Sequence, residues 1–377
     1  MRIPFNSPHE AGNERRYVAE AFAGRHLSGD GPFTKRCHAW LRAHHGAPTL
    51  LTHSCTAALE LCALLADLGP GDEVILPSFT FVSTANAFVL RGATPVFVDV
   101  EPQGLNLDAS LIEAAVTPRT RAICVVHYAG VGAAMDDILA IAARHGLLVF
   151  EDAAQGLMAS YRGRALGTFG ALGAISFHET KNIGCGEGGA LVLNDERLLA
   201  RAEVLREKGT NRNAFFRGEV DKYTWVDVGS SFLPSDITAA VLLAQLEHAA
   251  EITARRRDRW ARYHQAFTDA ESRELLLRPV ELPERTHNAH MYYLLARSLA
   301  HRTKILEATR ARGIGCMFHY VPLHSSPAGR RLGRVGSAMA VTDSISERLF
   351  RLPLWPDLTD AMLEEIVEVV ISEAERA

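Results

Sequence analysis

Short apolar runs alternate with amphipathic stretches between about residues 50 and 210. The apolar runs predict strands at 72–77, 94–99, 122–127, 147–150, 174–177 and 190–193, and helical periodicity covers 56–67, 84–91, 109–116 and 134–145. Nearly continuous apolar strands that alternate with helices are typical of a largely parallel sheet covered by helices on both faces. We therefore expect an α/β fold.

The pattern changes beyond residue 236. A helical stretch runs from Asp236 to about Phe267, and its first part is apolar nearly all round, as in a buried connecting helix. After a proline-containing polar stretch, the pattern predicts a strand at 289–296 and helices at 303–312 and 359–374. We assign residues 1–247 to a large domain and 248–377 to a smaller C-terminal α+β domain; the segment 329–337, rich in Gly and Arg, fits no pattern.

Composition excludes several classes of protein. The formal charge is -4 with both signs spread along the chain, so no basic stripe is available for nucleic acid. No apolar stretch approaches the roughly 18 residues of a membrane span, and the first residues lack the apolar core of a signal peptide. The six cysteines include no C-x-x-C pair, as is typical of reduced thiols. We expect a soluble cytoplasmic protein that binds neither nucleic acid nor a membrane.

One lysine stands where it could serve as a nucleophile. Lys181 ends the run Ser176-Phe-His-Glu-Thr-Lys181, and a glycine-rich stretch from Gly184 to Gly189 follows at once. A lysine at a strand end inside a pocket loses water, which favours the neutral amine, and the glycines let a planar group lie against the backbone. This is how a protein presents an amine to an aldehyde cofactor. The alternative is a surface lysine beside a loop.

The glycines also fit the dinucleotide fingerprint G-x-G-x-x-G at Gly184, Gly186 and Gly189. That motif should follow a strand and open a helix, whereas these glycines lead into the β-like run 190–193. The sequence therefore argues against a Rossmann dinucleotide site, and it contains no G-x-x-x-x-G-K-[ST] run for a P-loop.

An aspartate follows another predicted strand. Asp152 comes directly after the apolar run 147–150, and ligands of open α/β sheets bind outside the carboxyl ends of the strands. A carboxylate there can pair with a protonated pyridine nitrogen, as an enzyme that uses pyridoxal phosphate requires. The alternative is that Asp152 caps the N-terminus of a helix.

A cofactor phosphate needs amide donors, which the start of a helix provides. Cys55 and Thr56 lie at such a start, although a plain Ser or Thr cap explains the same residues. Ser176 and His178 alternate along the strand that precedes the lysine and could reach the same phosphate. Phe81 could stack on the cofactor ring, or it could be an ordinary core residue. His319 and His324 have no carboxylate or cysteine at ligand spacing, so we expect no zinc site.

Five ordered motifs carry a family resemblance: H-S-C-T-A-A-L (53–59), P-S-F-T-F-V-S-T-A-N-A (77–87), E-D-A-A-Q (151–155), S-F-H-E-T-K-N (176–182) and G-E-G-G (186–189). In this order they resemble the sugar aminotransferases of the DegT/DnrJ/StrS family over nearly the whole chain. The resemblance implies the aspartate aminotransferase fold (type I) and a homodimer with active sites at the subunit interface. It also implies pyridoxal phosphate joined to Lys181.

The same resemblance assigns roles by motif position. It implies Asp152 at the pyridine nitrogen, Gln155 near the ring hydroxyl and Phe81 on the ring face, with Cys55, Thr56 and Ser176 at the phosphate. Ser231 stands where many members have an asparagine that reaches the phosphate bound by the partner subunit. Six further residues are candidates for substrate recognition: Arg212, Arg217, Lys222, His319, Tyr320 and His324.

Segments such as 27–31, 207–212 and 221–225 are most similar to the branch of this family that forms TDP-4-amino-4,6-dideoxy-D-galactose. This resemblance implies amino transfer from L-glutamate to C4 of TDP-4-keto-6-deoxy-D-glucose, in the synthesis of a surface glycan such as lipopolysaccharide. Amination of another keto-sugar nucleotide, at C3 or with the other C4 stereochemistry, stays open. A related dehydratase is expected to carry histidine in place of Lys181, and a non-catalytic regulator would need a DNA-binding segment.

Overall fold

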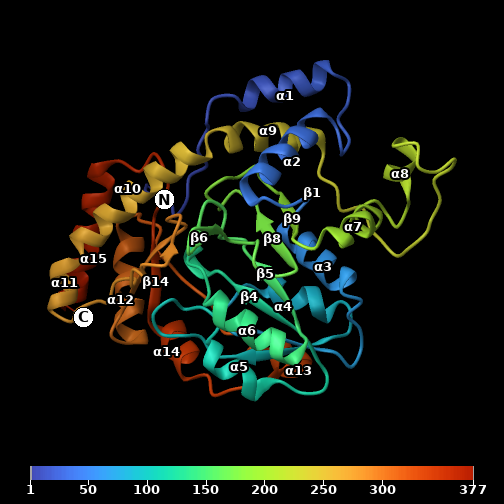
Figure 1. The fold of residues 1–377 in the computed structure, drawn as a ribbon. Helices are drawn as coiled ribbons and strands as arrows, with labels where there is room; N and C mark the ends of the chain where they lie inside the picture. The colour runs from blue at the N-terminus through green and yellow to red at the C-terminus, as the bar shows by residue number, and fades with distance from the viewer. Residues whose placement is uncertain (1, 377) are drawn as a thin grey trace.

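A mixed sheet of eight strands forms the centre of the molecule (Figure 1). The structure is a computed structural model that describes residues 2–376. From one edge to the other the strands are β1 (Thr49–Thr52), β9 (Gly189–Leu193), β8 (Leu172–Ser176), β5 (Leu148–Asp152), β4 (Thr120–Val126), β2 (Glu73–Pro77), β3 (Thr94–Val98) and β13 (Arg334–Val335). β9 runs antiparallel to both of its neighbours, β1 and β8, and the other described strands of this sheet all run in one direction. The expected α/β fold with a mostly parallel sheet is confirmed.

Helices cover both faces of this sheet because each strand is apolar on both sides. Ile75 and Val149 point to one face, whereas Leu76 and Phe150 point to the other, as the alternation of a strand requires. The first face carries α2 (Pro32–His45), α5 (Ala109–Ala115), α6 (Met135–His145) and α9 (Asp236–Glu247), with α1 (Glu14–Ala23) over α9. The second face carries α3 (Cys55–Leu65), α4 (Val82–Val89) and α7 (Leu199–Arg206).

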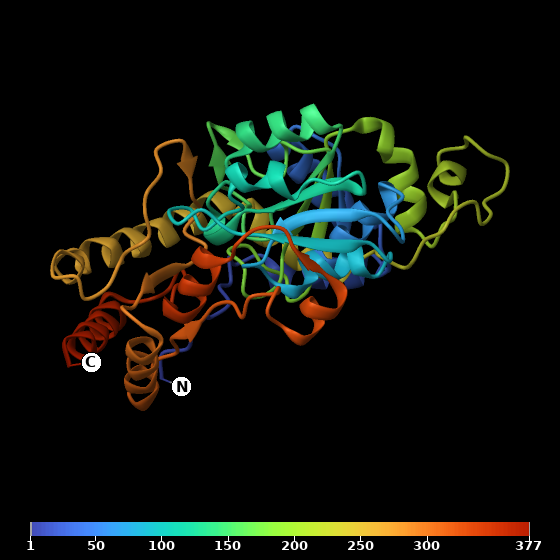
Figure 2. The ribbon, with the colours of Figure 1, turned by 90° about the horizontal axis from the view of Figure 1, so that it is seen from below.

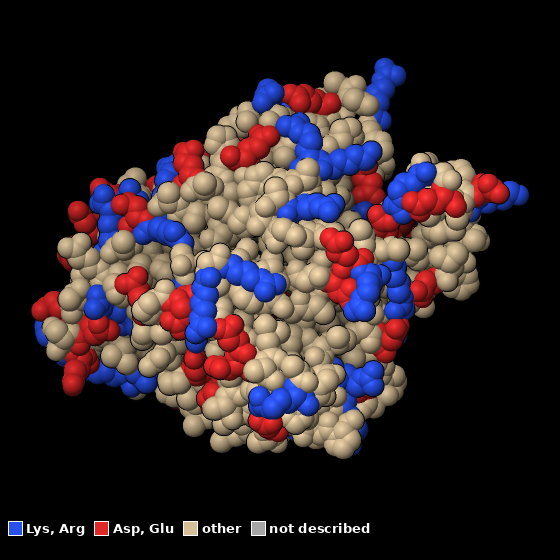
Figure 3. Space-filling model, in the orientation of Figure 1, with Lys and Arg blue, Asp and Glu red and all other residues tan. Residues whose placement is uncertain are grey.

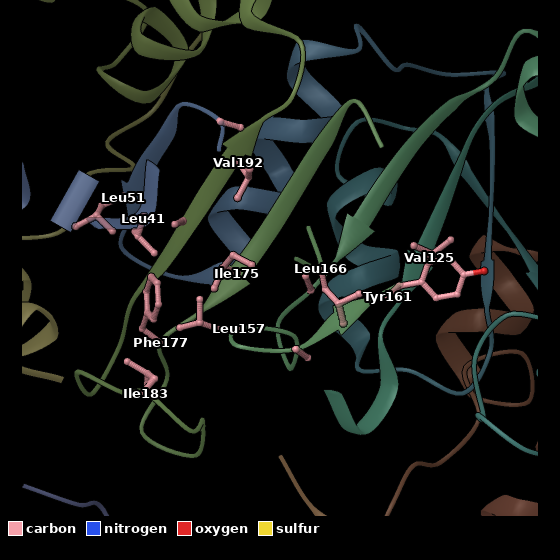
Figure 4. Packing of buried hydrophobic residues seen from close by; sticks show 14 of the residues in the cluster. Leu41, Leu51, Val125, Leu157, Tyr161, Leu166, Ile175, Phe177, Ile183 and Val192 are labelled. Carbon is pink, nitrogen blue, oxygen red and sulfur yellow. The ribbon is translucent and has the colours of Figure 1, made fainter. Parts of the chain in front are cut away.

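The core extends past the end of β8 toward the lysine. Figure 4 shows Ile175 of β8 close to Leu157, and Phe177 beside Ile183. Phe177 and Ile183 are both buried, one on each side of Lys181 in sequence. Their burial anchors the turn that carries the lysine.

A third core lies in the C-terminal part of the chain. It contains residues of α10 (Ala249–Ala266), α11 (Thr268–Ser272), α12 (Leu299–Ala311) and α15 (Asp360–Arg376), together with the sheet β11 (Tyr292–Leu295), β14 (Leu349–Leu352) and β12 (Met317–Phe318). Ile3 also belongs to this core, whereas α1 packs against α9 beside the large sheet. The N-terminal segment therefore runs from the C-terminal part of the molecule to the large sheet. Figure 2 shows these elements to one side of the large sheet. We retain residue 247 as a proposed domain boundary.

The remaining short elements are peripheral. They are the sheet β10 (Arg285–Thr286), β6 (Ser160–Tyr161) and β7 (Arg164–Ala165), the 3-10 turns η1 (Tyr128–Gly130) and η2 (Glu196–Leu198), and the helices α8 (Arg212–Phe216), α13 (Pro327–Leu332) and α14 (Ala340–Arg348). Residues 207–230, which include α8, form an arm that projects from the body in Figures 1 and 2.

Most of the predicted elements are present, with shifted ends. The helix expected over 236–267 is interrupted at His248, where the backbone leaves helical geometry, so that α9 and α10 are separate. The strand after the glycine-rich stretch begins at Gly189, and no helix opens there, which confirms the argument against a dinucleotide fingerprint. Helices α1 and α2 and strand β1 were not predicted.

Charges of both signs are interspersed on the face shown in Figure 3. In the described part of the chain, no helix combines the length and apolar character that a membrane crossing requires.

A buried carboxylate secures the end of β5. The Glu151 side chain accepts hydrogen bonds from the amides of Gly167 (2.8 Å), Phe169 (2.5 Å) and Gly170 (2.7 Å). It also lies 2.9 Å from Nε2 of His127, whose Nδ1 accepts from the amide of Ala133, so Nε2 is the donor toward Glu151. This one side chain thus ties β5 to β4 and to the loop before β8.

We predict that Glu151→Ala destabilises the fold by about 3 kcal/mol or more, because three amides and one imidazole lose their buried acceptor. Urea unfolding followed by circular dichroism measures the change. Glu113→Ala, which removes an exposed carboxylate that pairs with Arg144 and His145, is the control and should leave the unfolding midpoint nearly unchanged. Equal midpoints for the two variants would contradict this role of Glu151.

Candidate active site

A cavity of about 650 Å³ opens at the edge of the sheet where the parallel strands end. One wall comes from the segments that follow the carboxyl ends of β1, β2, β4, β5 and β8, which is where open α/β sheets bind ligands. The opposite wall comes from the C-terminal part of the chain and from Phe5 and Asn6 of the N-terminal segment. The site is therefore enclosed between two parts of the molecule that are distant in sequence.

Lys181 lies in this cavity, although not on a strand. β8 ends at Ser176, and a tight turn follows in which the Lys181 amide donates to the carbonyl of His178 (2.8 Å). Asn6 Nδ2 donates to the carbonyl of Glu179 and so ties the N-terminal segment to this turn. Burial lowers the pKa of the Lys181 amine, and the nearby guanidinium of Arg351 lowers it further. The burial of Lys181 supports the expectation of a desolvated lysine. The expected position at the end of the strand is wrong, because Lys181 lies five residues after the end of β8.

Asp152 is the last residue of β5 and faces the same cavity. Its Oδ2 accepts from Thr84 Oγ1 (2.7 Å), and its Oδ1 accepts from the amide of Ala154 (3.2 Å). Burial raises the pKa of this carboxyl, while the hydrogen bonds and the Lys181 charge act in the opposite direction. A turn follows Asp152, so the alternative of a helix cap is wrong.

The start of α3 faces the cavity through Cys55 and Thr56. Ser54 is the N-cap, and its Oγ accepts from the amide of Ala57 (3.1 Å), so the cap and the candidate phosphate contacts are different residues. A Cβ at Gly189 would lie 2.4 Å from the Cys55 nitrogen, so only glycine lets β9 pass this close to the helix start. The helix dipole and its first amides favour an anion here.

Ser176, His178, Gln155 and Phe81 also line the cavity. Gln155 Oε1 accepts from the amide of Ala129 (2.7 Å), and its Nε2 donates to Oη of Tyr320 (3.4 Å), another residue of the cavity wall. Phe81 is 57% exposed at the start of α4, which contradicts the alternative of a core residue and leaves its ring open to stacking.

These residues fit pyridoxal phosphate. The cavity offers an amine of lowered pKa for the aldehyde, a buried carboxylate for a protonated ring nitrogen and an exposed aromatic ring for stacking. It also offers a helix start with hydroxyl groups at Thr56 and Ser176 for a phosphate.

Other predicted residues lie outside the cavity of their own chain. Arg212 and Arg217 belong to the arm and pair with Glu207 (3.1 Å) and Glu203 (2.8 Å), and Lys222 is exposed on the same arm. Ser231 lies at the base of the arm, where its backbone forms an isolated antiparallel β-bridge with Glu207. His324 lies 2.8 Å from Ser78 Oγ and 3.4 Å from Asp343. His319 and Tyr320, by contrast, line the cavity.

The cavity also contains residues that the sequence analysis did not single out: Arg256, His290 and Arg351. Arg256 donates to the carbonyls of Ala289 (3.1 Å) and His290 (2.8 Å), and burial lowers its pKa to about 9. His290 Nδ1 lies 3.1 Å from Asn182 Oδ1, which links the C-terminal wall to the residue after the lysine. Of these three residues, only Arg351 could have been noticed in the sequence, because it is a single charged residue inside the apolar run of β14.

The lowered pKa of Lys181 predicts how its reactivity depends on pH. In the cofactor-free protein a larger fraction of this amine is neutral at pH 8 to 9 than at the exposed lysines, so it should be acetylated at lower pH than they are. Competitive labelling with acetic anhydride, read residue by residue by mass spectrometry, tests this. A midpoint for Lys181 at or above those of the exposed lysines would contradict it.

Known proteins are similar to this chain over nearly its whole length. The chain is 34% identical over 380 residues to the spore coat polysaccharide biosynthesis protein SpsC of Bacillus subtilis, covering 98% of this chain and 96% of that one. The aminotransferase TlmJ of Streptoalloteichus hindustanus is 31% identical, with a TM-score of 0.90 over 99% of this chain and 98% of that one. A Streptococcus pneumoniae protein solved in its PMP form is 26% identical, with a TM-score of 0.92 over 99% of each chain.

A family model matches nearly the full length, over residues 8–371. The motif residues that resemble this family include the ones that the fold brings together around Lys181 and Asp152. The chain belongs to the DegT/DnrJ/EryC1/StrS aminotransferase family.

Proposed function

We propose that this chain transfers an amino group from L-glutamate to C4 of TDP-4-keto-6-deoxy-D-glucose and forms TDP-4-amino-4,6-dideoxy-D-galactose. The general activity, sugar amino transfer with pyridoxal phosphate, follows from the family and from relatives solved with this cofactor. The observation that supports amino transfer by this chain is the common cavity of Lys181 and Asp152 beside the start of α3.

Bound in this cavity, pyridoxal phosphate supplies an electron sink for negative charge that develops at a substrate carbon. Lys181 Nζ is the group placed to hold the aldehyde and, once released, to take the proton from the α-carbon of the amino donor. Asp152, oriented by Thr84 and the Ala154 amide, holds a proton at the ring nitrogen. Gln155 Oε1 is engaged by the Ala129 amide, and one N–H of its Nε2 donates to Tyr320 Oη at 3.4 Å, so the second N–H would donate to the ring hydroxyl.

The choice of substrate rests on sequence. The segments 27–31, 207–212 and 221–225 are most similar to the branch that makes the 4-amino-galactose product. A keto-sugar nucleotide aminated at C3, or with the other stereochemistry at C4, is the second candidate, since the cavity residues serve any ketone equally. Lys181 disfavours the dehydratase alternative.

We also propose a homodimer. The arm exposes large apolar side chains, with Phe216 66% and Trp225 77% exposed, and aromatic residues of this kind are favoured at interfaces. Ser231, at the base of the arm, would then approach the phosphate in the partner subunit. Sedimentation velocity would measure the oligomeric state, and a monomer at micromolar concentration would contradict the proposal.

The direct test of the activity is incubation of the cofactor-loaded protein with L-glutamate and a panel of keto-sugar nucleotides. Mass spectrometry detects the amino sugar, and NMR assigns the carbon and its stereochemistry. An amino group at C4 with the galactose configuration supports the proposal. Amination of another carbon or epimer supports the second candidate, and the absence of any amino sugar would contradict both.

Lys181→Ala should abolish turnover while the protein still folds and binds pyridoxal phosphate without a covalent link, because no other described amine is placed on this turn. Product formation and cofactor absorbance are the two measurements. Lys35→Ala, which removes an exposed lysine of α2, is the matched control and should retain full turnover. Turnover by Lys181→Ala at the wild-type rate would overturn the assignment.

Asp152→Asn should reduce turnover by roughly a hundredfold to ten-thousandfold, because a neutral amide no longer holds a proton at the ring nitrogen. Steady-state kinetics per bound cofactor measure the effect. The control is Asp99→Asn, which alters another buried aspartate that caps α14 through the amides of Val341 and Thr342. If both variants lost the same activity per bound cofactor, the role of Asp152 would be purely structural.

A further inference from the structure

Arg351 is a cation in the cavity wall with no carboxylate beside it. It belongs to β14, opposite Tyr293 of β11 and Met317 of β12, and it lines the cavity. Its Nη2 donates to the carbonyl of Phe318 (3.3 Å). Within residues 2–376, its buried Nε donates to no protein atom, and no Asp or Glu forms an ion pair with the guanidinium. A donor capable of several hydrogen bonds is thus left open.

The guanidinium is nevertheless held in place. Its carbon lies 4.6 Å from the ring centre of Phe5, so the plane of the side chain is supported from the N-terminal segment as well as by Phe318. Burial lowers the pKa of Arg351, as expected for a charge withdrawn from water without a counterion. Such a charge is costly unless an anion pairs with it, which indicates that an anionic ligand group belongs at this position.

The other cations of the cavity have different partners or roles. Arg256 uses Nε and Nη2 to hold the carbonyls of Ala289 and His290, so it serves the wall itself. The proposed phosphate position lies at the start of α3 and at Ser176, on the strand side of the cavity. Arg351 lies on the C-terminal side, and it therefore marks a second anion position in addition to that of the cofactor phosphate.

We propose that Arg351 binds a carboxylate of the amino donor; this inference rests on the proposed aminotransferase function. A guanidinium matches a carboxylate with two parallel hydrogen bonds, and among the described residues Nη1 and the second N–H of Nη2 have no protein acceptor. The neighbouring cavity residues Phe5, Met317 and Leu352 are apolar, which suits the short aliphatic chain of a dicarboxylic amino acid. A diphosphate carries more charge than this one free guanidinium balances.

Arg302 provides a matched control. Its guanidinium also stacks on an aromatic ring, that of Phe318 at 5.4 Å, and its Nε is likewise buried without a protein partner. It donates to the carbonyl of Ser346 and is not among the residues that line the cavity. Arg302→Gln therefore removes a similarly placed guanidinium from a position that does not line the cavity.

The test is isothermal titration calorimetry on the cofactor-loaded protein with three probes: glutarate, its neutral diamide glutaramide, and thymidine diphosphate. Arg351→Gln should weaken glutarate binding by roughly 10- to 100-fold, the usual loss of a charge-assisted hydrogen-bonded pair. Arg351→Lys should recover part of the loss. Glutaramide and thymidine diphosphate should bind both variants as they bind the wild type, and Arg302→Gln should bind glutarate normally.

Thermal unfolding and cofactor absorbance first establish that each variant is folded and loaded. A folded, loaded Arg351→Gln with wild-type affinity for glutarate overturns the proposal, as does a wild type that binds no glutarate. Loss of thymidine diphosphate binding alone overturns it in favour of a site for the sugar nucleotide. None of these outcomes bears on Lys181→Ala, so failure of this inference is distinguishable from failure of the proposed function.

Discussion

The site depends on withdrawing an amine and a carboxylate from water into one cavity. Burial lowers the pKa of Lys181 and raises that of Asp152, so both groups are pushed toward their neutral forms. For the amine this shift is what nucleophilic attack on an aldehyde requires. For the carboxylate the penalty is offset by Thr84, by the Ala154 amide and by any cation that binds opposite it. A cofactor with a protonated ring nitrogen and an aldehyde satisfies both groups at once.

The scaffold makes this withdrawal possible by fixing the ends of the parallel strands. Successive residues at the end of β5 point in opposite directions, so Glu151 secures the loop before β8 while Asp152 faces the cavity. Phe177 and Ile183 are buried on either side of the lysine turn and limit its movement. The cavity is closed from the other side by residues that follow in sequence only after position 250, together with the N-terminal segment.

The local sequence pattern was sufficient to predict the residues of the cavity wall that follows the strand ends. It was insufficient to predict the residues of the wall from the C-terminal part of the chain. Lys181 and Asp152 were predictable because each follows an apolar run and the carboxyl ends of parallel strands meet at one edge. The start of α3 was predictable from the Ser and Thr residues that precede its apolar helical run, although β1 was not. Arg256 and His290 were not, because nothing in their own segments indicates that these segments reach the cavity. The two-residue strand β13 was unpredictable for a similar reason, since it exists only by pairing with β3. The residues of the arm lie away from their own cavity, and their proposed roles depend on a second subunit.

The most direct test of the central claim is to reduce the cofactor-loaded protein with borohydride and locate the modified residue by peptide mass spectrometry. We predict one modified lysine, Lys181, with the mass of a reduced pyridoxyl phosphate. Modification of a different lysine, or of none after the cofactor has bound, would contradict it.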